Sequence, residues 1–242
     1  MWIAIAISTI PVATLAQGVD SFSDSALLRN GDFYSNLFHQ KFLNRLVDPL
    51  KSRRGNRLVR RETTTVSPSK VPATQTSTIT VPQPNGATMP KKLAQSAPEA
   101  QRQTVEKVFS QLLARYPKLE EQFNIPANDL AGAMAAFVIL NYETYQGTQL
   151  NSSQVEVVVK QMRTAISTSP QFQTATAVQK RELYEQMAIL GMYVGGLNLA
   201  LKQTPNPQIA IRLKTASKGY LETLLQTSVD RISIKKNGLE IQ

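Results

Sequence analysis

The chain has 242 residues, and its 42% hydrophobic content is typical of a folded protein and excludes disorder along the whole length. It has no cysteine and one histidine, which excludes disulfides, cysteine-ligated metal centres and metal sites built from several histidines. The net charge of +10 is uneven, because residues 96–242 hold 15 basic and 12 acidic side chains and residues 1–95 hold the other 12 and five. These counts predict a basic arm on a nearly neutral body.

Residues 1–16 have the pattern of a secretory signal peptide. The apolar run WIAIAISTIPVATLA (2–16) is shorter than the roughly 20 residues of a membrane span. Thr14 and Ala16 stand where the small residues of a cleavage site belong, although no basic residue precedes the run. We expect a periplasmic or secreted protein, and the alternative is an uncleaved anchor or a buried segment.

Residues 17–61 are expected to form a basic amphipathic arm. Apolar residues between positions 33 and 50 recur mainly at three- and four-residue steps, as in a helix. A basic run follows, made of Lys51, Arg53, Arg54, Arg57, Arg60 and Arg61. Such an arm can bind an anionic membrane surface or an envelope protein, whereas export argues against nucleic acid as a partner. The alternative is a solvated arm whose apolar face packs on the main domain or on a partner.

Residues 62–95 are predicted to be a disordered linker. Of these 34 positions eight are Thr, five Pro and three Ser, and none is aromatic. Such a segment buries too little apolar surface to offset the entropy of ordering it.

The remaining residues, 96–242, carry the periodicity of a helical body. We expect Ser96 to cap a first helix that Pro117 ends or kinks. Asn128 is predicted to cap a second helix, which runs to about Gln146 and stops at Gly147. The third is predicted to begin with a capping box formed by Asn151 and Gln154, before Pro170 closes the segment.

The longest predicted helix covers residues 178–202 and contains a GxxxG pattern, Gly191 and Gly195. Its apolar run is too short for a membrane span, so we expect a buried core helix. The two glycines are expected to pack closely on the small face of the 128–146 helix, formed by Ala131, Gly132, Ala135 and Ala136.

A last helix is predicted after Asn206, and the tail then changes to the alternating pattern of strands around an Asn237–Gly238 turn. The sequence therefore predicts an all-α fold. It would be an antiparallel bundle of about five main helices with a small C-terminal β-hairpin.

Three blocks in this body resemble a family of mostly exported bacterial proteins known only as a domain of unknown function. The blocks are NDLAGAMAAFVILNYETYQG (128–147), QKRELYEQMAILGMYV (179–194) and SVDRISIKKNGL (228–239). The resemblance covers about residues 96–240 and leaves the arm and linker outside. It implies an all-helical, periplasmic or secreted domain and brings no activity, substrate or catalytic residue with it.

No phosphate loop, HExxH, GxSxG, dinucleotide-binding glycine pattern or EF-hand loop is present. We therefore predict no catalytic residue, metal or cofactor. In an up-and-down bundle the amino ends of the second and fourth helices meet, which would bring together Asn128, Asp129, Arg181, Glu182 and Glu185. Two carboxylates there could perform acid–base chemistry, but helix caps and a surface ion-pair cluster are the better interpretation. At the other end, Asn141, Tyr142 and Glu143 favour a Tyr–Glu hydrogen bond between helices over an active site.

Three functions fit these patterns. The first is an exported, non-catalytic helical module that binds a protein or an envelope surface through its arm or a groove of the bundle. The second is a carboxylate-dependent hydrolase of envelope material, and the third is a carrier of an apolar ligand. The exclusions above favour the first.

Overall fold

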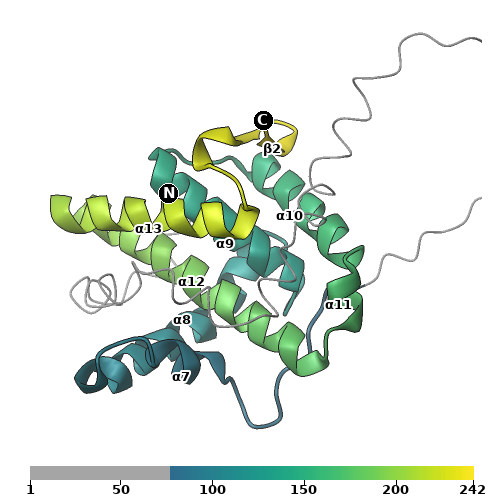
Figure 1. Ribbon diagram of the computed structural model, residues 1–242, viewed down its shortest axis with the longest axis horizontal. Helices are drawn as coiled ribbons and strands as arrows, with labels where there is room; N and C mark the ends of the chain where they lie inside the picture. Colours follow the sequence, from purple (N-terminus) through teal and green to yellow (C-terminus); the bar gives the residue numbers. More distant parts are fainter. Residues whose placement is uncertain (1–76) are drawn as a thin grey trace, which may run out of the picture.

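The computed structural model describes residues 77–242, so the predicted signal segment, the arm and the linker as far as residue 76 lie outside the described residues. The chain forms, in order, α7 (Met89–Ala94), a 3-10 turn (Glu99–Gln101), α8 (Arg102–Gln122), α9 (Leu130–Gln146), α10 (Ser152–Ser167), α11 (Pro170–Thr174), α12 (Ala177–Gln203), α13 (Pro207–Leu225), a 3-10 turn (Val229–Arg231), β1 (Ile232–Lys235) and β2 (Gly238–Ile241) (Figure 1). The predicted all-α bundle with a terminal hairpin is confirmed.

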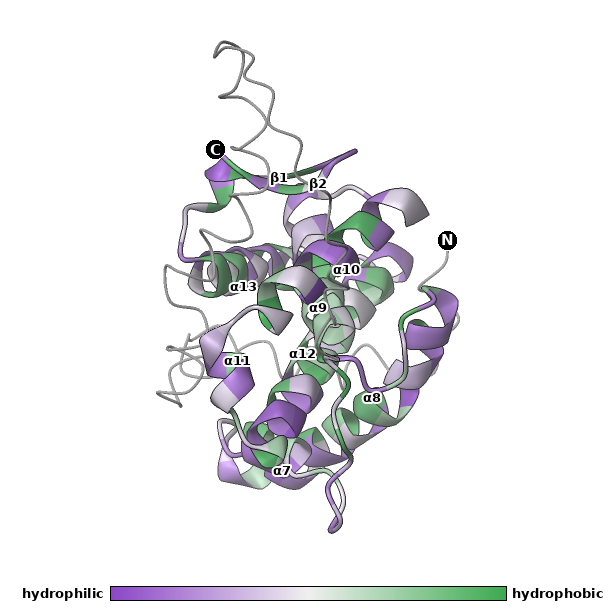
Figure 2. Cartoon of the chain, turned by 90° about the vertical axis from the view of Figure 1, so that its right-hand side faces the viewer, coloured by the Kyte–Doolittle hydropathy of each residue, from purple (hydrophilic) through white to green (hydrophobic). Residues whose placement is uncertain are grey.

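Helix α9 is the centre of the bundle. All its residues from Leu130 to Thr144 are buried, and α10, α12 and α13 pack around it. A helix that is apolar on all sides is stable only when other elements cover every side. Figure 2 shows the hydrophobic residues gathered where these helices meet, with hydrophilic residues on the outer faces.

The two most closely packed helices, α9 and α12, run parallel. A Cβ added at Gly191 would lie 3.2 Å from the Cα of Phe137, and one added at Gly195 would lie 2.9 Å from a methyl group of Leu140. Residue numbers rise together along both helices, as an up-and-down bundle requires. The prediction that the GxxxG pattern belongs to a core helix agrees with this packing, although the face it meets differs from the one predicted. Gly132 lies against Ile125 instead.

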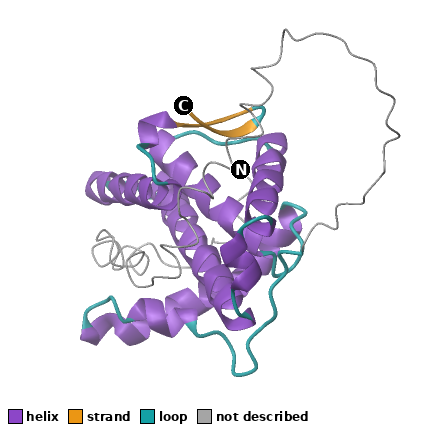
Figure 3. Ribbon diagram, turned by 45° about the vertical axis from the view of Figure 1, so that its right-hand side comes forward, coloured by secondary structure: helices purple, strands orange, loops and turns teal. Residues whose placement is uncertain are grey.

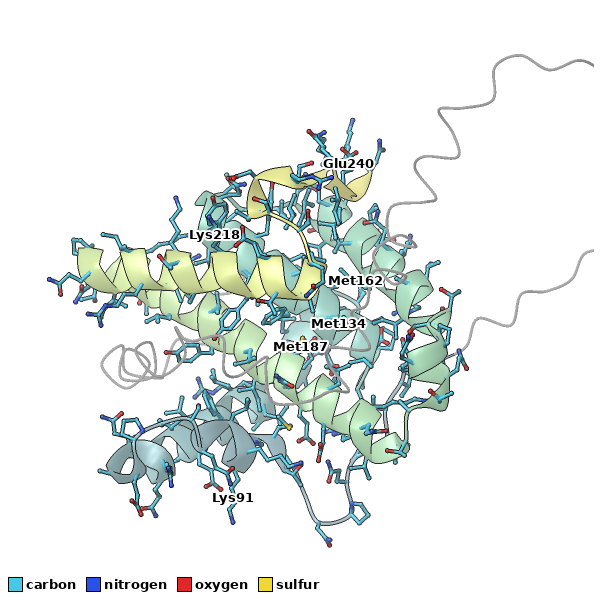
Figure 4. The ribbon with its side chains drawn as sticks, in the orientation of Figure 1. Lys91, Met134, Met162, Met187, Lys218 and Glu240 are labelled. Atoms are coloured by element: carbon cyan, nitrogen blue, oxygen red, sulfur yellow. The ribbon has the colours of Figure 1, made fainter. Side chains whose placement is uncertain are left out.

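Ring contacts fix the direction of the neighbouring helix α8. Tyr116 meets Tyr184 edge-on with ring centroids 5.7 Å apart, and Phe109 meets Tyr193 in the same way at 6.1 Å. Numbers fall along α8 as they rise along α12, so these two helices are antiparallel. Three fully buried methionines fill the space between α9, α10 and α12, namely Met134, Met162 and Met187 (Figure 4).

The hairpin lies across one end of the helices and packs on α10 (Figure 3). Its strands pair Lys235 with Gly238, so the two turn residues are Lys236 and Asn237 rather than the predicted Asn237 and Gly238. The positive φ of 99° falls on Gly238 alone, which fits a type I turn followed by a glycine bulge. Gln161 on α10 fixes this register, because its amide group bonds both the N–H and the carbonyl of Leu239.

The predicted start of the first body helix is wrong, and so is an end at Pro117, which was expected to end or kink it. Ser96 does not cap α8, since its hydroxyl donates to the Leu93 carbonyl at 2.7 Å and the helix begins only at Arg102. Pro117 does not end it, because α8 continues to Gln122. A proline removes a single backbone donor, and burial of Leu119 in the core favours continuing the helix beyond it.

The predicted linker is wrong for residues 77–95, which pack on the body. Thr80 N–H donates to the Asn128 carbonyl at 2.9 Å, and Leu130 N–H donates to the Thr78 carbonyl at 3.0 Å. Further along, α7 buries Met89 among the core residues. We call residues 77–95 the strap. The composition of 62–95 as a whole concealed the apolar residues of its second half.

A membrane span is not found among residues 77–242, because no helix there combines sufficient length with sufficient hydrophobicity.

Candidate functional site

The amino ends of α9 and α12 meet, as the sequence predicted. We call Asn128, Asp129, Arg181, Glu182 and Glu185 the amino-terminal cluster. Arg181 joins the two helices, because one nitrogen donates to Asn128 Oδ1 at 2.6 Å and Nε donates to Glu185 Oε1 at 2.8 Å. The three acidic side chains of the cluster do not form the carboxylate pair that acid–base chemistry would need. Each of them is hydrogen-bonded to its own set of partners.

Glu185 holds the amino end of the strap helix α7. Its side chain is fully buried, and its Oε2 accepts the backbone N–H groups of Thr88 and Met89 at 3.1 and 3.2 Å. A carboxylate placed on the free N–H groups of a helix end stabilises that end. With Arg181 on its other oxygen, Glu185 has a structural role that accounts for its burial.

Glu182 lies about one turn before Glu185 in α12, and its side chain is more exposed than that of Glu185. Its Oε1 accepts from Lys92 Nζ at 2.7 Å and from the Thr88 hydroxyl at 3.2 Å. Lys92 is half exposed, so water screens this ion pair and limits its contribution to stability. Glu182 and Glu185 thus both bind the beginning of the strap helix.

Asp129 is turned away from Arg181 toward α10. Its carboxylate accepts from Arg163 Nη2 at 2.5 Å and from the hydroxyl of Thr78 in the strap. Asp129, rather than Asn128, occupies the cap position of α9, and its side chain makes no capping bond. Asn128 was wrongly predicted as the cap: its φ of 60° places it in the left-handed region that asparagine tolerates, so it ends the preceding loop.

A buried Tyr–Glu pair lies beside this cluster and was not predicted. Tyr184 donates its hydroxyl proton to Glu120 Oε1 at 3.0 Å. Burial raises the pKa of Glu120, and the Tyr184 hydrogen bond partly opposes that rise. Burial likewise raises the pKa of Tyr184 and of the adjacent Tyr116. Both phenols therefore stay protonated. The hydrogen bond between Tyr184 and Glu120 joins α12 to α8. In the sequence, the adjacent Glu120 and Glu121 gave no indication that one of them is buried.

A concave pocket of about 330 Å³ opens between the end of α8, the second half of α9 and the start of α10. Apolar side chains make up most of its wall: Leu119, Phe123, Ile125, Ala136, Ile139, Leu140, Leu150, Val155 and Val159. The polar part consists of Gln122, Glu143, Gln149, Asn151 and Ser152. We call this the α8–α10 pocket. A second, more polar hollow adjoins it, and the two share Gln122, Phe123, Ser152 and Val159.

Glu143 gives the α8–α10 pocket its charge. The side chain is only 7% exposed, and its Oε1 accepts the N–H of Leu150 at 2.7 Å. The Tyr–Glu hydrogen bond predicted for Tyr142 and Glu143 is therefore replaced by a bond to the backbone of Leu150, near the end of the α9–α10 connection. Burial raises the pKa of Glu143 because its charged form loses hydration.

A comparison with family models matches residues 1–242 to a family of unknown function (DUF6683). The chain belongs to this family. No curated protein matches the chain, and no solved structure matches it either. The family match extends over the whole chain, so the arm and linker, which the resemblance left outside, are part of the DUF6683 sequence as well.

The family match carries no activity, so the chemistry of this DUF6683 member rests on its own side chains. Within residues 77–242, no three His, Cys, Asp or Glu side chains gather closely enough to hold a metal ion. The carboxylates of the amino-terminal cluster are bound to backbone donors and cations. The α8–α10 pocket is a concave feature that combines a mostly apolar wall with the buried carboxylate of Glu143.

Proposed function

We propose that this chain is an exported, non-catalytic helical module that binds an apolar ligand in the α8–α10 pocket. The observation that carries the proposal is the pocket itself. Its volume of about 330 Å³ and its mostly apolar wall match the usual features of ligand pockets. The proposal joins the first function expected from the sequence, a non-catalytic module, to the third, a carrier.

At the amino-terminal cluster, the environment of Glu185 and Asp129 supports a structural role over hydrolysis. A general acid or base must face the substrate with an oxygen free to exchange a proton. Glu185 is fully buried and accepts two backbone N–H groups and Arg181, while Asp129 accepts Arg163 and Thr78. The hydrolase hypothesis is tested directly by assaying turnover of peptidoglycan and glycan substrates with the wild type and Glu182→Gln.

The pocket is tested with the full-length chain and a neutral fluorescent dye such as Nile red, whose emission rises in apolar surroundings. Ala136 lines the pocket from α9 and is nearly buried, so Ala136→Leu should place a larger side chain in the pocket and obstruct binding. Ala210 is an exposed residue of α13, and Ala210→Leu provides the matched control. We expect saturable binding at one site in the wild type and in Ala210→Leu, and loss of binding in Ala136→Leu. Equal binding in both variants, or no saturable binding in the wild type, would contradict the proposal.

A second contact is proposed for the basic arm, with an anionic membrane surface as its partner. The run Lys51, Arg53, Arg54, Arg57, Arg60 and Arg61 supports this, because each basic residue near such a surface adds about 1 kcal/mol of attraction. Co-sedimentation of the full chain with vesicles containing anionic lipid should be lost when these six residues are changed to Gln. Vesicle binding that persists after this change, or that does not weaken when salt is added, would exclude the arm as the part of the chain that contacts the membrane. Export itself is tested by fractionating cells of the native organism.

A further inference from the structure

Glu143 is the single charged residue among the fourteen that line the α8–α10 pocket. It projects from the last turns of α9, and its neighbours in the wall include Leu140, Ile139 and Leu150. The pocket therefore has an apolar body and one acidic end. A ligand that fits both must have an apolar part and a polar group placed at its end.

Within residues 77–242, no cation pairs directly with the Glu143 carboxylate. Among the described residues its side chain has one hydrogen bond, from the N–H of Leu150 to Oε1, and it forms no ion pair with a described cation. Of the described cations, Lys202 acts on it through a longer-range attraction. A buried carboxylate in this situation gains from a cation that replaces the hydration it has lost.

We propose that the α8–α10 pocket binds a small amphiphile with an apolar chain and a cationic ammonium head, and that Glu143 holds the head. The apolar wall takes the chain, and the carboxylate accepts a charge-assisted hydrogen bond from the ammonium group. An amphiphile with an anionic head is repelled by the same carboxylate. This inference rests on the proposed function, to which it adds the chemical class of the ligand.

The test compares three probes of equal chain length, n-decylamine, n-decanol and n-decanoate, by calorimetry with the full-length protein at neutral pH. A charge-assisted hydrogen bond predicts that the amine binds about tenfold or more tightly than the alcohol, and that decanoate binds most weakly. Glu143→Gln keeps an oxygen that can accept the Leu150 N–H but removes the charge, so the amine should lose its advantage while decanol binding persists.

Glu156→Gln is the matched control, because Glu156 is an exposed carboxylate of α10 that lines the adjoining hollow and not the α8–α10 pocket. It should preserve the preference for the amine. Should Glu143→Gln fold poorly, the pH dependence of the wild type replaces it: the amine preference must fall on acidification, as Glu143 takes up a proton, and a constant preference would overturn the inference.

The outcomes separate the two claims. Decanol binding that Ala136→Leu abolishes, together with no preference for the amine over decanoate in the wild type, leaves the pocket as a binding site and overturns the role of Glu143. A preference for the amine that survives in Glu143→Gln overturns it equally. Failure of all three probes to bind the wild type contradicts the proposed function itself.

Discussion

Gly191 of α12 lies directly against the backbone of Phe137 in α9. A Cβ built at Gly191 would be 3.2 Å from the Phe137 Cα and 3.4 Å from its nitrogen. Because both near atoms belong to the backbone of a buried helix, they cannot rotate away as a side chain can. The absence of a side chain at this position allows the two central helices to approach closely here.

Replacing Gly191 with Ala should therefore destabilise the protein. Crowding against the Phe137 backbone costs about 1–3 kcal/mol, and the better helix propensity of alanine returns about 1 kcal/mol, so we expect a net loss near 1 kcal/mol. Gly219 lies within α13, and a Cβ added there would meet no atom within 4 Å, so Gly219→Ala should gain about 0.5–1 kcal/mol. Urea unfolding of both variants checks the sign, and equal effects would contradict the close approach.

Glu185→Gln should loosen the strap. The change removes the negative charge of the carboxylate that accepts the N–H groups of Thr88 and Met89. It also leaves Arg181 without its ion pair. We expect a loss of about 2–4 kcal/mol in the free energy of unfolding. Faster hydrogen exchange in α7 should accompany it.

The control for that change is Glu182→Gln, which affects the more exposed ion pair with Lys92. It should cost about 1 kcal/mol or less. If the two variants have the same stability and the same exchange rates in α7, Glu185 does not hold the strap.

The boundary of the folded domain can be tested by truncation. A chain beginning at residue 96 lacks the whole strap and should be less stable than one beginning at residue 77. Burial of Met89 and Leu93 alone contributes about 3–6 kcal/mol, and removing the strap also exposes the acceptors on Asp129 and Glu185. Thermal unfolding followed by circular dichroism measures the difference, and equal midpoints for the two truncated chains would place the boundary at residue 96 after all.

The raised pKa of Glu143 predicts a specific dependence of stability on pH. The folded protein holds this proton more tightly than the unfolded chain does, so the contribution of Glu143 to stability falls as pH rises from the ordinary glutamate pKa through the raised value. Glu143→Gln has no such proton, and its stability relative to the wild type should therefore be greater at about pH 7 than at about pH 4.

Glu156 is expected to change stability with pH in the opposite direction. Its hydrogen bond to Lys160 lowers its pKa, so its small contribution is present above the ordinary glutamate pKa and is lost on acidification. Relative to the wild type, Glu156→Gln should become slightly less stable as pH rises. If the free energy of unfolding, relative to the wild type, changes with pH in the same direction for both variants, the assigned environment of Glu143 is contradicted.

Periodicity alone predicted the longer helices, because an apolar face recurs along each of them. The capping box of Asn151 and Gln154 and the left-handed Gly147 were also predicted correctly, since both depend on residues within a few positions of one another. Pro117 and Ser96 misled the prediction for the same reason: local preference does not register that Leu119 is needed in the core or that Ser96 follows a helix of the strap.

The sequence by itself determined the helical class, the number of main helices and the meeting of Asn128 with Arg181, because these follow from spacing along each helix and from the alternation of helix directions. Tertiary structure alone decided that residues 77–95 join the core and that Glu185 binds the start of α7, some 96 positions away. It also decided that Glu143 faces a pocket assembled from three helices. Contacts between distant segments depend on how whole helices pack, and no local pattern encodes that packing.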